Sequence, residues 1–397
     1  MLHSLRAFSY AGEADIFREY ARLSGIAGGF GLDFDISALR DLSDADYAAL
    51  APTRWPVSDT KQGGRFFADG KFYHPDGKAR LVATAYREPA ARTGRRYPFR
   101  LNTGRIRDQW HTMTRTGLSP RLSAHLAEPF LEIHPTDAQD LGIAPADLVQ
   151  ARSPNGEAIL RARITDSVQR GQVFAPMHWT GENAPTARVD DLVAPVYDPI
   201  SGQPESKASV VALHRFDAKW YGFAVSSQPM RPDCAYWAHV PSRKGYRAEL
   251  AGRSEISDWE NTALRLFGLE DVSLSSIVDN ARGIARIALT RDEQLLAALF
   301  VAPEPVAVSR DYLATLPTSA VPTVLSGRVP ADVPDPGPVL CSCFSVGVNT
   351  IVDAIETQHL FSVDAIGAAL QAGSNCGSCR PEIAALIQTR RSQEAAE

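Results

Sequence analysis

Two close pairs of cysteines near the end of the chain constrain its structure more than any other feature. Cys341-x-Cys343 and Cys376-x2-Cys379 hold four of the five cysteines. Thiolates bind soft metals, and four of them suit either a tetrahedral zinc ion or a 2Fe–2S cluster. The unequal spacing favours the cluster, because structural zinc sites more often repeat C-x2-4-C in both halves. Zinc remains the second interpretation, and disulfides or unrelated thiols the third.

Length and charge narrow the class of protein. A chain of 397 residues is long enough for roughly two to four domains with cores of their own. Its net charge of −5 gives no general attraction to nucleic acid or membrane. Nine arginines nevertheless lie between Arg87 and His125, opposed only by Glu88 and Asp108, which favours an anionic small molecule nearby. No apolar signal segment follows Met1 and no apolar stretch is long enough to span a membrane, so a reducing cytoplasm is expected.

The first segment, residues 1–96, is expected to be the remnant of an upstream catalytic domain. Apolar periodicity predicts one helix at Glu13–Ser24, and Ser43 is a candidate N-cap for a second at Ser43–Leu50. The rest is rich in Gly and Pro, with strand-like pieces only at 65–67 and 81–86. This segment has too little apolar sequence to form a core alone.

Residues 97–214 change to short strands separated by Gly and Pro, which predicts a closed β-barrel of about six strands. A helix capped by Thr136 and ended by Gly142 is expected within it. The expected strands are 99–102, 130–133, 148–153, 157–165, 172–176 and 208–213.

The remaining sequence predicts three further segments, and the whole chain is expected to be an α+β multidomain protein. Residues 215–328 are a mixed α/β region, with a helix at 258–267, a hairpin of strands 284–289 and 295–301, and a short helix at 311–316. Residues 329–338 contain four prolines and form a stiff linker. Residues 339–390 form a small all-helical domain around the cysteines, whose tether would let it swing.

Two stretches resemble known families. The sequence around the cysteines, with Phe344-Ser345-Val346-Gly347 after the first pair and Gly373-Ser374-Asn375 before the second, resembles the bacterioferritin-associated-ferredoxin-like 2Fe–2S domain. The segments LNTGRIRDQWHTMTRTG, LEIHPTDAQDLGI and DPISGQPESK resemble the molybdopterin-dinucleotide-binding domain of molybdenum oxidoreductases, a double-psi β-barrel. Together with DIFREYARLSG and WYGFAVSS, they are similar to the C-terminal portion of bacterial assimilatory nitrate reductase catalytic subunits.

The resemblance implies cofactors and the residues that bind them. It implies a bis(molybdopterin guanine dinucleotide) molybdenum cofactor, and a 2Fe–2S cluster on Cys341, Cys343, Cys376 and Cys379. No catalytic residue is assigned, although His178 of Met177-His178-Trp179 matches a loop near the substrate. Asp190 departs from the family, which has Asn there, so its contact is the one most in doubt. The implied pterin-dinucleotide contacts are Thr103, Gly104, Arg105, Trp110, His111, Thr112, Asp190 and Lys207.

Plainer interpretations stand beside these. Without the resemblance, His178 would be a core residue, Lys207 a surface lysine, His111 a turn residue and Cys234 a buried, inert thiol.

The function that the resemblance implies is reduction of nitrate to nitrite, with electrons from a ferredoxin or an NAD(P)H-dependent flavoprotein passing through the 2Fe–2S cluster. Such enzymes carry further cofactor-holding domains that this sequence lacks, so the chain alone is expected to be inactive. Two alternatives remain: an electron-transfer or assembly protein without catalysis of its own, and a related molybdenum enzyme such as a formate dehydrogenase.

Overall fold

The computed structural model of the chain describes residues 8–317 and 320–394. The sequence predicts no signal segment after Met1, and residues 1–7 lie outside the described residues. The chain separates into two compact units, Met1–Arg87 and Glu88–Glu397. Within the described ranges, no helix has the length and apolar character that crossing a membrane requires.

The first unit is helical and otherwise irregular. The two predicted helices are confirmed as α1 (Glu13–Gly29) and α2 (Asp44–Ala48), joined by the 3-10 turn η2 (Ser37–Leu39). The Ser43 side chain caps α2 by accepting a hydrogen bond from the Asp46 amide over 3.1 Å. The strands expected at 65–67 and 81–86 are wrong, because neither stretch has a strand to pair with; Leu81 is 97% exposed.

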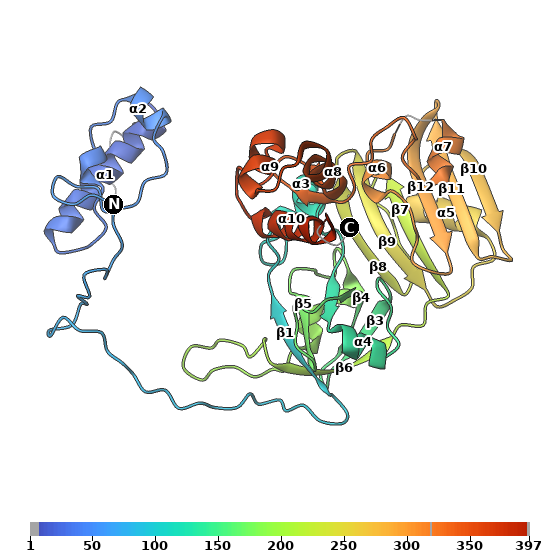
Figure 1. Cartoon of the computed structure of the whole chain (residues 1–397), viewed down its shortest axis with the longest axis horizontal. Coiled ribbons are helices and arrows are strands. Elements are labelled where there is room, and N and C mark those ends of the chain that lie inside the picture. Colours follow the sequence, from blue (N-terminus) through green and yellow to red (C-terminus); the bar gives the residue numbers. More distant parts are fainter. Residues whose placement is uncertain (1–7, 318–319, 395–397) are drawn as a thin grey trace. The chain divides into compact units, whose positions relative to one another are not determined.

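Six strands of the second unit close into the predicted barrel, in the order β1-β5-β2-β4-β3-β6 (Figure 1). β1 pairs with β5 and β2 with β4 in parallel, and the other neighbours are antiparallel. α4 (Pro135–Asp140) is capped by His134 and not by Thr136, because His134 Nδ1 accepts from the Thr136 amide over 3.2 Å. The strands are β1 Phe99–Gly104, β2 Phe130–Ile133, β3 Leu148–Arg152, β4 Glu157–Ile164, β5 Gln172–Pro176 and β6 Ser209–Arg215.

The mixed region forms a six-stranded antiparallel sheet in the order β10-β11-β12-β7-β9-β8. The expected helix and hairpin are confirmed as α5 (Trp259–Phe267) and β11–β12, and the short helix at 311–316 as α6 (Arg310–Leu313). A further helix, α7 (Val321–Ser326), follows. The strands are β7 Trp220–Ser226, β8 Tyr236–Ser242, β9 Gly245–Gly252, β10 Ser273–Asp279, β11 Ile284–Arg291 and β12 Gln294–Ala302.

The two faces of this sheet belong to different cores. Alternate residues of a strand point to opposite faces, so Tyr221, Phe223 and Val225 of β7 join the core of the barrel. Trp220 and Ala224 of the same strand face the other way, into a second core that includes α5. The barrel and the sheet therefore share one hydrophobic core.

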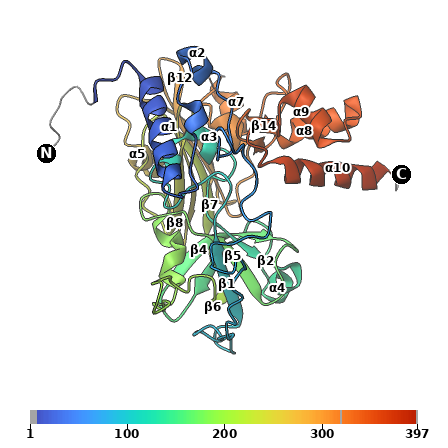
Figure 2. The same ribbon diagram turned by 90° about the vertical axis from the view of Figure 1, so that its left-hand side faces the viewer.

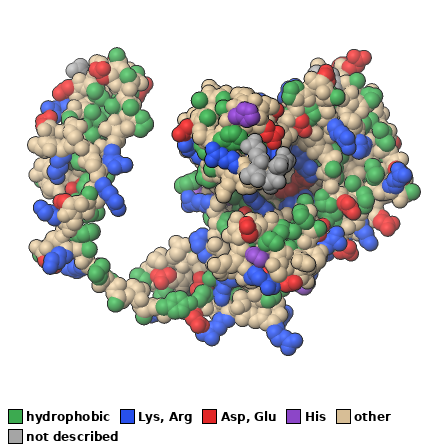
Figure 3. Space-filling model, viewed as in Figure 1, with side chains coloured by type: hydrophobic (Ala, Val, Ile, Leu, Met, Phe, Trp, Pro, Cys, Tyr) green, Lys and Arg blue, Asp and Glu red, His purple; other side chains and the backbone are tan. Residues whose placement is uncertain are grey.

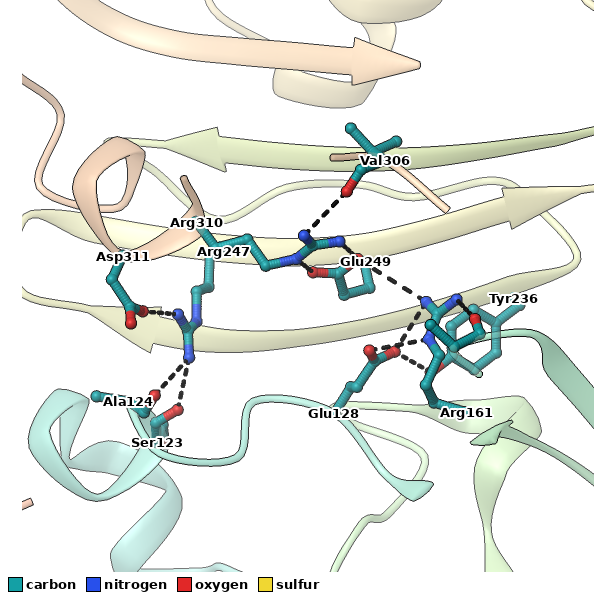
Figure 4. Close-up of polar contacts among 11 residues, drawn as sticks. Ser123, Ala124, Glu128, Arg161, Tyr236, Arg247, Glu249, Val306, Arg310 and Asp311 are labelled. Atoms are coloured by element: carbon teal, nitrogen blue, oxygen red, sulfur yellow. Dashed lines mark hydrogen bonds and ion pairs between the residues drawn. The ribbon is translucent and has the colours of Figure 1, made fainter. Parts of the chain in front are cut away.

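Charged side chains buried at this junction satisfy one another (Figure 4). Arg161 of β4 makes two hydrogen bonds of 3.0 Å to the Glu128 carboxylate, which also accepts from the Tyr236 hydroxyl over 2.8 Å. Glu249 of β9 accepts from Arg310 over 2.6 Å. Buried charges are tolerated when they are paired, so this network fixes how the sheet packs on the barrel.

The cysteine module combines three helices with a two-stranded hairpin, so the expectation of an all-helical domain is only partly met. The hairpin strands are β13 (Val339–Cys341) and β14 (Val346–Gly347), with Cys343 in the turn between them. α8 (Val348–Gln358), α9 (Val363–Leu370) and α10 (Arg380–Glu394) follow and lie together on one side of the barrel and sheet (Figure 2). The module has its own small core, to which Cys341 and Cys379 belong.

Candidate functional site

The four clustered cysteines meet as two pairs, each with one member from each sequence motif. The sulfur atoms of Cys343 and Cys376 lie 3.4 Å apart, and the thiols of Cys341 and Cys379 are hydrogen-bonded to each other. Cys341 and Cys379 are buried, whereas Cys376 is exposed. All five cysteines of the chain lie in the described ranges, and none forms a disulfide.

The surroundings of the thiols differ between the pairs. A hydrogen bond with the Ser378 side chain lowers the pKa of Cys376, and burial raises the pKa of Cys379 to about 11. In residues 8–317 and 320–394, no group of three or more Cys, His, Asp or Glu side chains is arranged to hold one metal ion. A 2Fe–2S cluster instead takes four thiolates shared between two irons, so two pairs of thiols are a donor set of the right kind for it.

The second candidate site is the loop that follows β1. Thr103 is buried, and its hydroxyl donates a hydrogen bond to the Ser206 carbonyl over 2.8 Å. A Cβ at Gly104 would lie 2.7 Å from the Phe174 ring, so any other residue there would have to displace that ring. The Arg105 guanidinium stacks over the Trp110 ring at 4.4 Å. His111 and Thr112 are exposed, and His111 has a left-handed backbone with φ of 46°.

His178 holds this loop through two hydrogen bonds to its backbone. It is fully buried, and its Nε2 accepts a hydrogen bond from the Ile106 amide over 2.9 Å. Its Nδ1 lies 2.6 Å from the His111 carbonyl, so Nδ1 carries the proton. Burial lowers the pKa of His178, which keeps the ring neutral. With no exposed surface and both nitrogens bonded to the loop, His178 is placed to position backbone rather than to meet a substrate.

Lys207 and Asp190, the two remaining sequence candidates, are placed differently. The Lys207 ammonium donates to the Thr103 carbonyl over 2.6 Å, which brings it to the start of the loop. Asp190 lies in the 3-10 turn η5 (Val189–Leu192), which packs against β4 and β6. Burial, and then the neighbouring Asp191 carboxylate, raise the pKa of Asp190. The structure therefore joins Lys207 to the loop and sets Asp190 on the barrel wall.

Gln109 is a further candidate site residue that no sequence pattern singles out. It lies in the loop, is only 4% exposed, and neither its amide oxygen nor its amide nitrogen has a partner among the described residues. Buried amides are normally satisfied, so an unpaired donor and acceptor indicate a missing polar ligand. The edge of a pterin or guanine ring offers both a donor and an acceptor, and the loop therefore fits such a group.

The arginine-rich stretch is only partly available to a ligand. Arg100 donates to the carbonyls of Ala91 and Ala208, over 2.7 Å each, and Arg107 contacts the cysteine module. On the face shown in Figure 3, basic and acidic side chains are interspersed. The local excess of arginine is thus in part structural.

Comparisons with known families assign a domain to each of the two regions. Residues 99–222 match the model described as Molydopterin dinucleotide binding domain, and residues 339–389 match the BFD-like 2Fe-2S binding domain. The loop after β1 lies within the first match and all four clustered cysteines lie within the second. The prediction of these two binding domains is thereby confirmed.

Three relatives that match long stretches of the chain are two nitrate reductases and a formate dehydrogenase subunit. A nitrate reductase of Klebsiella oxytoca is 36% identical over 394 residues, which are 98% of this chain and 44% of that protein. The assimilatory nitrate reductase catalytic subunit of Bacillus subtilis (strain 168) is 32% identical over 52% of this chain and 28% of its own length. The F420-dependent formate dehydrogenase subunit alpha of Methanocaldococcus jannaschii is 35% identical over 41% and 23%. The chain thus spans less than half the length of these relatives.

Proposed function

Because the chain carries a molybdopterin dinucleotide-binding domain followed by a BFD-like 2Fe–2S binding domain, we propose that it forms part of a molybdenum-dependent nitrate reductase. The observation that carries this proposal is similarity to a nitrate reductase over 98% of the chain, a stretch that includes both domains. The free thiols of the module suit a reducing cytoplasm, where we place the protein.

The loop after β1 would grip one pterin dinucleotide of a bis(molybdopterin guanine dinucleotide) molybdenum cofactor. When bound, this cofactor supplies the chemistry that converts nitrate, two electrons and two protons into nitrite and water. The protein provides the grip and the orientation. Gly104 lets the backbone approach, the stacked Arg105 and Trp110 offer a cationic and aromatic surface, and His178 holds the loop in shape. The other proposed contacts are Thr103, Gln109, His111, Thr112, Lys207 and Asp190.

The four clustered cysteines would hold a 2Fe–2S cluster that accepts electrons from a ferredoxin or an NAD(P)H-dependent flavoprotein. The chain purified without air should contain iron and acid-labile sulfide in equal amounts and show broad visible absorption. Cys376→Ser should lose most of this absorption, whereas Cys234→Ser should keep it. A colourless protein that binds zinc would overturn the proposed relay.

Nitrate reduction is tested by exchange with a complete enzyme, since this chain spans less than half the length of its relatives. We expect no sustained nitrite production when the isolated chain is given reduced viologen and nitrate. We expect turnover to return when the chain replaces the matching region of the Klebsiella oxytoca enzyme. A hybrid that contains molybdenum and iron but makes no nitrite would argue against the proposal.

A second candidate function is formate oxidation, which the similarity to a formate dehydrogenase subunit over 41% of the chain favours. That similarity is shorter than the one to the Klebsiella enzyme, so nitrate remains the first choice. Assaying the same hybrid with formate and an oxidised dye separates the two. A hybrid that fills with both cofactors but acts on neither substrate would leave this chain as an electron-transfer part.

A further inference from the structure

Asp108, a residue of the loop after β1, is buried against the cysteine module. Its Oδ1 accepts a hydrogen bond over 2.9 Å from the hydroxyl of Ser342, the residue between Cys341 and Cys343. Its Oδ2 lies 2.6 Å from Nδ1 of His125. Burial acts to raise the pKa of Asp108, but the hydrogen bonds from His125 and Ser342 outweigh it and the pKa is lowered. A charged carboxylate is therefore enclosed where barrel and module meet.

Arg107, the preceding residue, reaches the module at two further points. Its guanidinium forms an ion pair with Glu382 and donates a hydrogen bond to the Leu340 carbonyl. Leu340 immediately precedes Cys341, and Glu382 lies three residues after Cys379. The Arg107 side chain is only 16% exposed. The Arg107 guanidinium thus contacts the module next to Cys341 and close to Cys379 in the sequence.

The loop that makes these contacts is itself held firmly. His178 bonds the amide of Ile106, immediately before Arg107, and the carbonyl of His111, three residues after Asp108. The residues that face the module therefore sit in a stretch fixed at both ends. Since the same loop carries the proposed pterin contacts, a shift of the module would be transmitted directly to it.

Two weaker contacts join the module to α6 and to the turn between β8 and β9. The Val339 amide donates to Asp311 over 3.3 Å, and Arg243 donates to the Ser345 hydroxyl over 2.7 Å in an exposed position. Exposed polar contacts contribute little to stability, whereas an unpaired buried charge is costly. Arg107 and Asp108 should therefore decide whether the module stays in place.

We propose that Arg107 and Asp108 dock the 2Fe–2S module on the barrel and hold its cysteines beside the pterin-binding loop. The module is then a fixed part of the electron path and does not swing on its proline-rich tether. This inference rests on the proposed function only for the identity of the two cofactors. The docking contact itself consists of residues of this chain.

The test measures the position of the module in the full chain. A spin label on Asp166→Cys, an exposed residue between β4 and β5, would be paired with the reduced cluster in a pulsed EPR distance measurement. The parent and the control Arg115→Ala, an exposed arginine in the same loop region, should give one narrow distance distribution. Arg107→Ala and Asp108→Ala should give a broad one. Narrow distributions in both variants would overturn the proposal.

Hydrogen exchange gives a second measurement that needs no cluster. Backbone amides in a peptide spanning 339–348 should exchange at least about tenfold faster in Asp108→Ala than in Arg115→Ala, because the module opens more often once its buried charged partner is lost. Ser342→Ala removes the same contact from the module side, which covers the case where Asp108→Ala fails to fold. In the double variant Asp108→Ala/Ser342→Ala, the amides should exchange no faster than in either single variant, because all three lose the same hydrogen bond. A further, additive rise in the exchange rate would contradict the docking contact.

Discussion

At the scale of single residues, His178 shows how a candidate from sequence can have a different role in the fold. Its two ring nitrogens bond the Ile106 amide and the His111 carbonyl across the loop. We predict that His178→Ala lowers the free energy of unfolding by about 2–5 kcal/mol, because two buried backbone groups lose partners and a cavity opens. Denaturant titration would measure this. The exposed His214→Ala should change it by less than about 0.5 kcal/mol.

The same histidine predicts a pH dependence. Because burial lowers its pKa in the folded state, the unfolded chain binds its proton more readily. Between the folded pKa and the ordinary value of about 6.5, stability should therefore fall as the pH falls, and above that range it should not change. Unfolding titrations of His178→Gln should show a smaller loss between about pH 6.5 and 5 than the parent does. Equal losses would mean that His178 is not buried as a neutral ring.

Cys234 offers a test of the difference between structural and ligating thiols. Burial raises its pKa to about 11, and its thiol donates to the Tyr236 carbonyl over 3.0 Å. The thiolate is the reactive form, so Cys234 should stay unmodified when the native, cluster-free protein is treated with iodoacetamide at neutral pH. Exposed Cys376 should be alkylated readily, which mass spectrometry would show. Early alkylation of Cys234 would contradict its raised pKa.

At the scale of elements, two arginines of β4 differ in burial, so substitutions at them can be compared. The Arg161 side chain is 11% exposed and pairs with Glu128, whereas that of Arg163 is 53% exposed. Arg161→Ala should cost about 3–5 kcal/mol, because the largely buried Glu128 carboxylate loses its ion-pair partner. Arg163→Ala should cost less than about 1 kcal/mol. Thermal unfolding of the two variants would compare these costs, and similar values would contradict the account of the buried network.

The close packing of Gly347 against Pro336 allows a test of whether the linker, residues 329–338, contacts the module. A Cβ at this position would lie 1.9 Å from the Pro336 carbonyl oxygen, so Gly347→Ala must push the linker away. The amides of Val348 and Asn349, which donate to Pro338 and Pro336, should then exchange hydrogen faster. Gly181→Ala, where the added methyl meets nothing within 4 Å, is the control. Unchanged protection in Gly347→Ala would show that the linker is not packed there.

Most of the barrel strands could be predicted from sequence because they are short runs that begin or end near Gly or Pro. The strand β7 could not, because it is buried on both faces and shows no alternation. Periodicity at 81–86 was misleading, since a strand needs a neighbour that only the fold can supply.

The candidate sites could likewise be predicted from sequence only in part. The loop after β1 and the cysteine quartet stand out in the sequence. The contacts of Asp108 with Ser342 and of Arg107 with Glu382 join residues more than 200 positions apart, and no local pattern contains them.

At the scale of the whole molecule, the proposed relay predicts a difference between electron donors. In a complete nitrate reductase, deleting the region that matches residues 338–397 should slow reduction by the natural protein donor. A small artificial donor should still reach molybdenum, so viologen-dependent nitrite production should persist. Parallel rate measurements with both donors would check this; an equal loss with both would argue that the module is needed for folding and not for electron entry.

The core that the barrel shares with the sheet affects how a minimal fragment should be cloned. The dinucleotide-binding match ends at residue 222, which lies within β7. A stop codon placed there would remove Phe223 and Val225, both fully buried, and would open the barrel side of the core to water. Such a fragment should aggregate during expression. A crystallisable fragment should extend at least through α7, so that the sheet still covers the barrel.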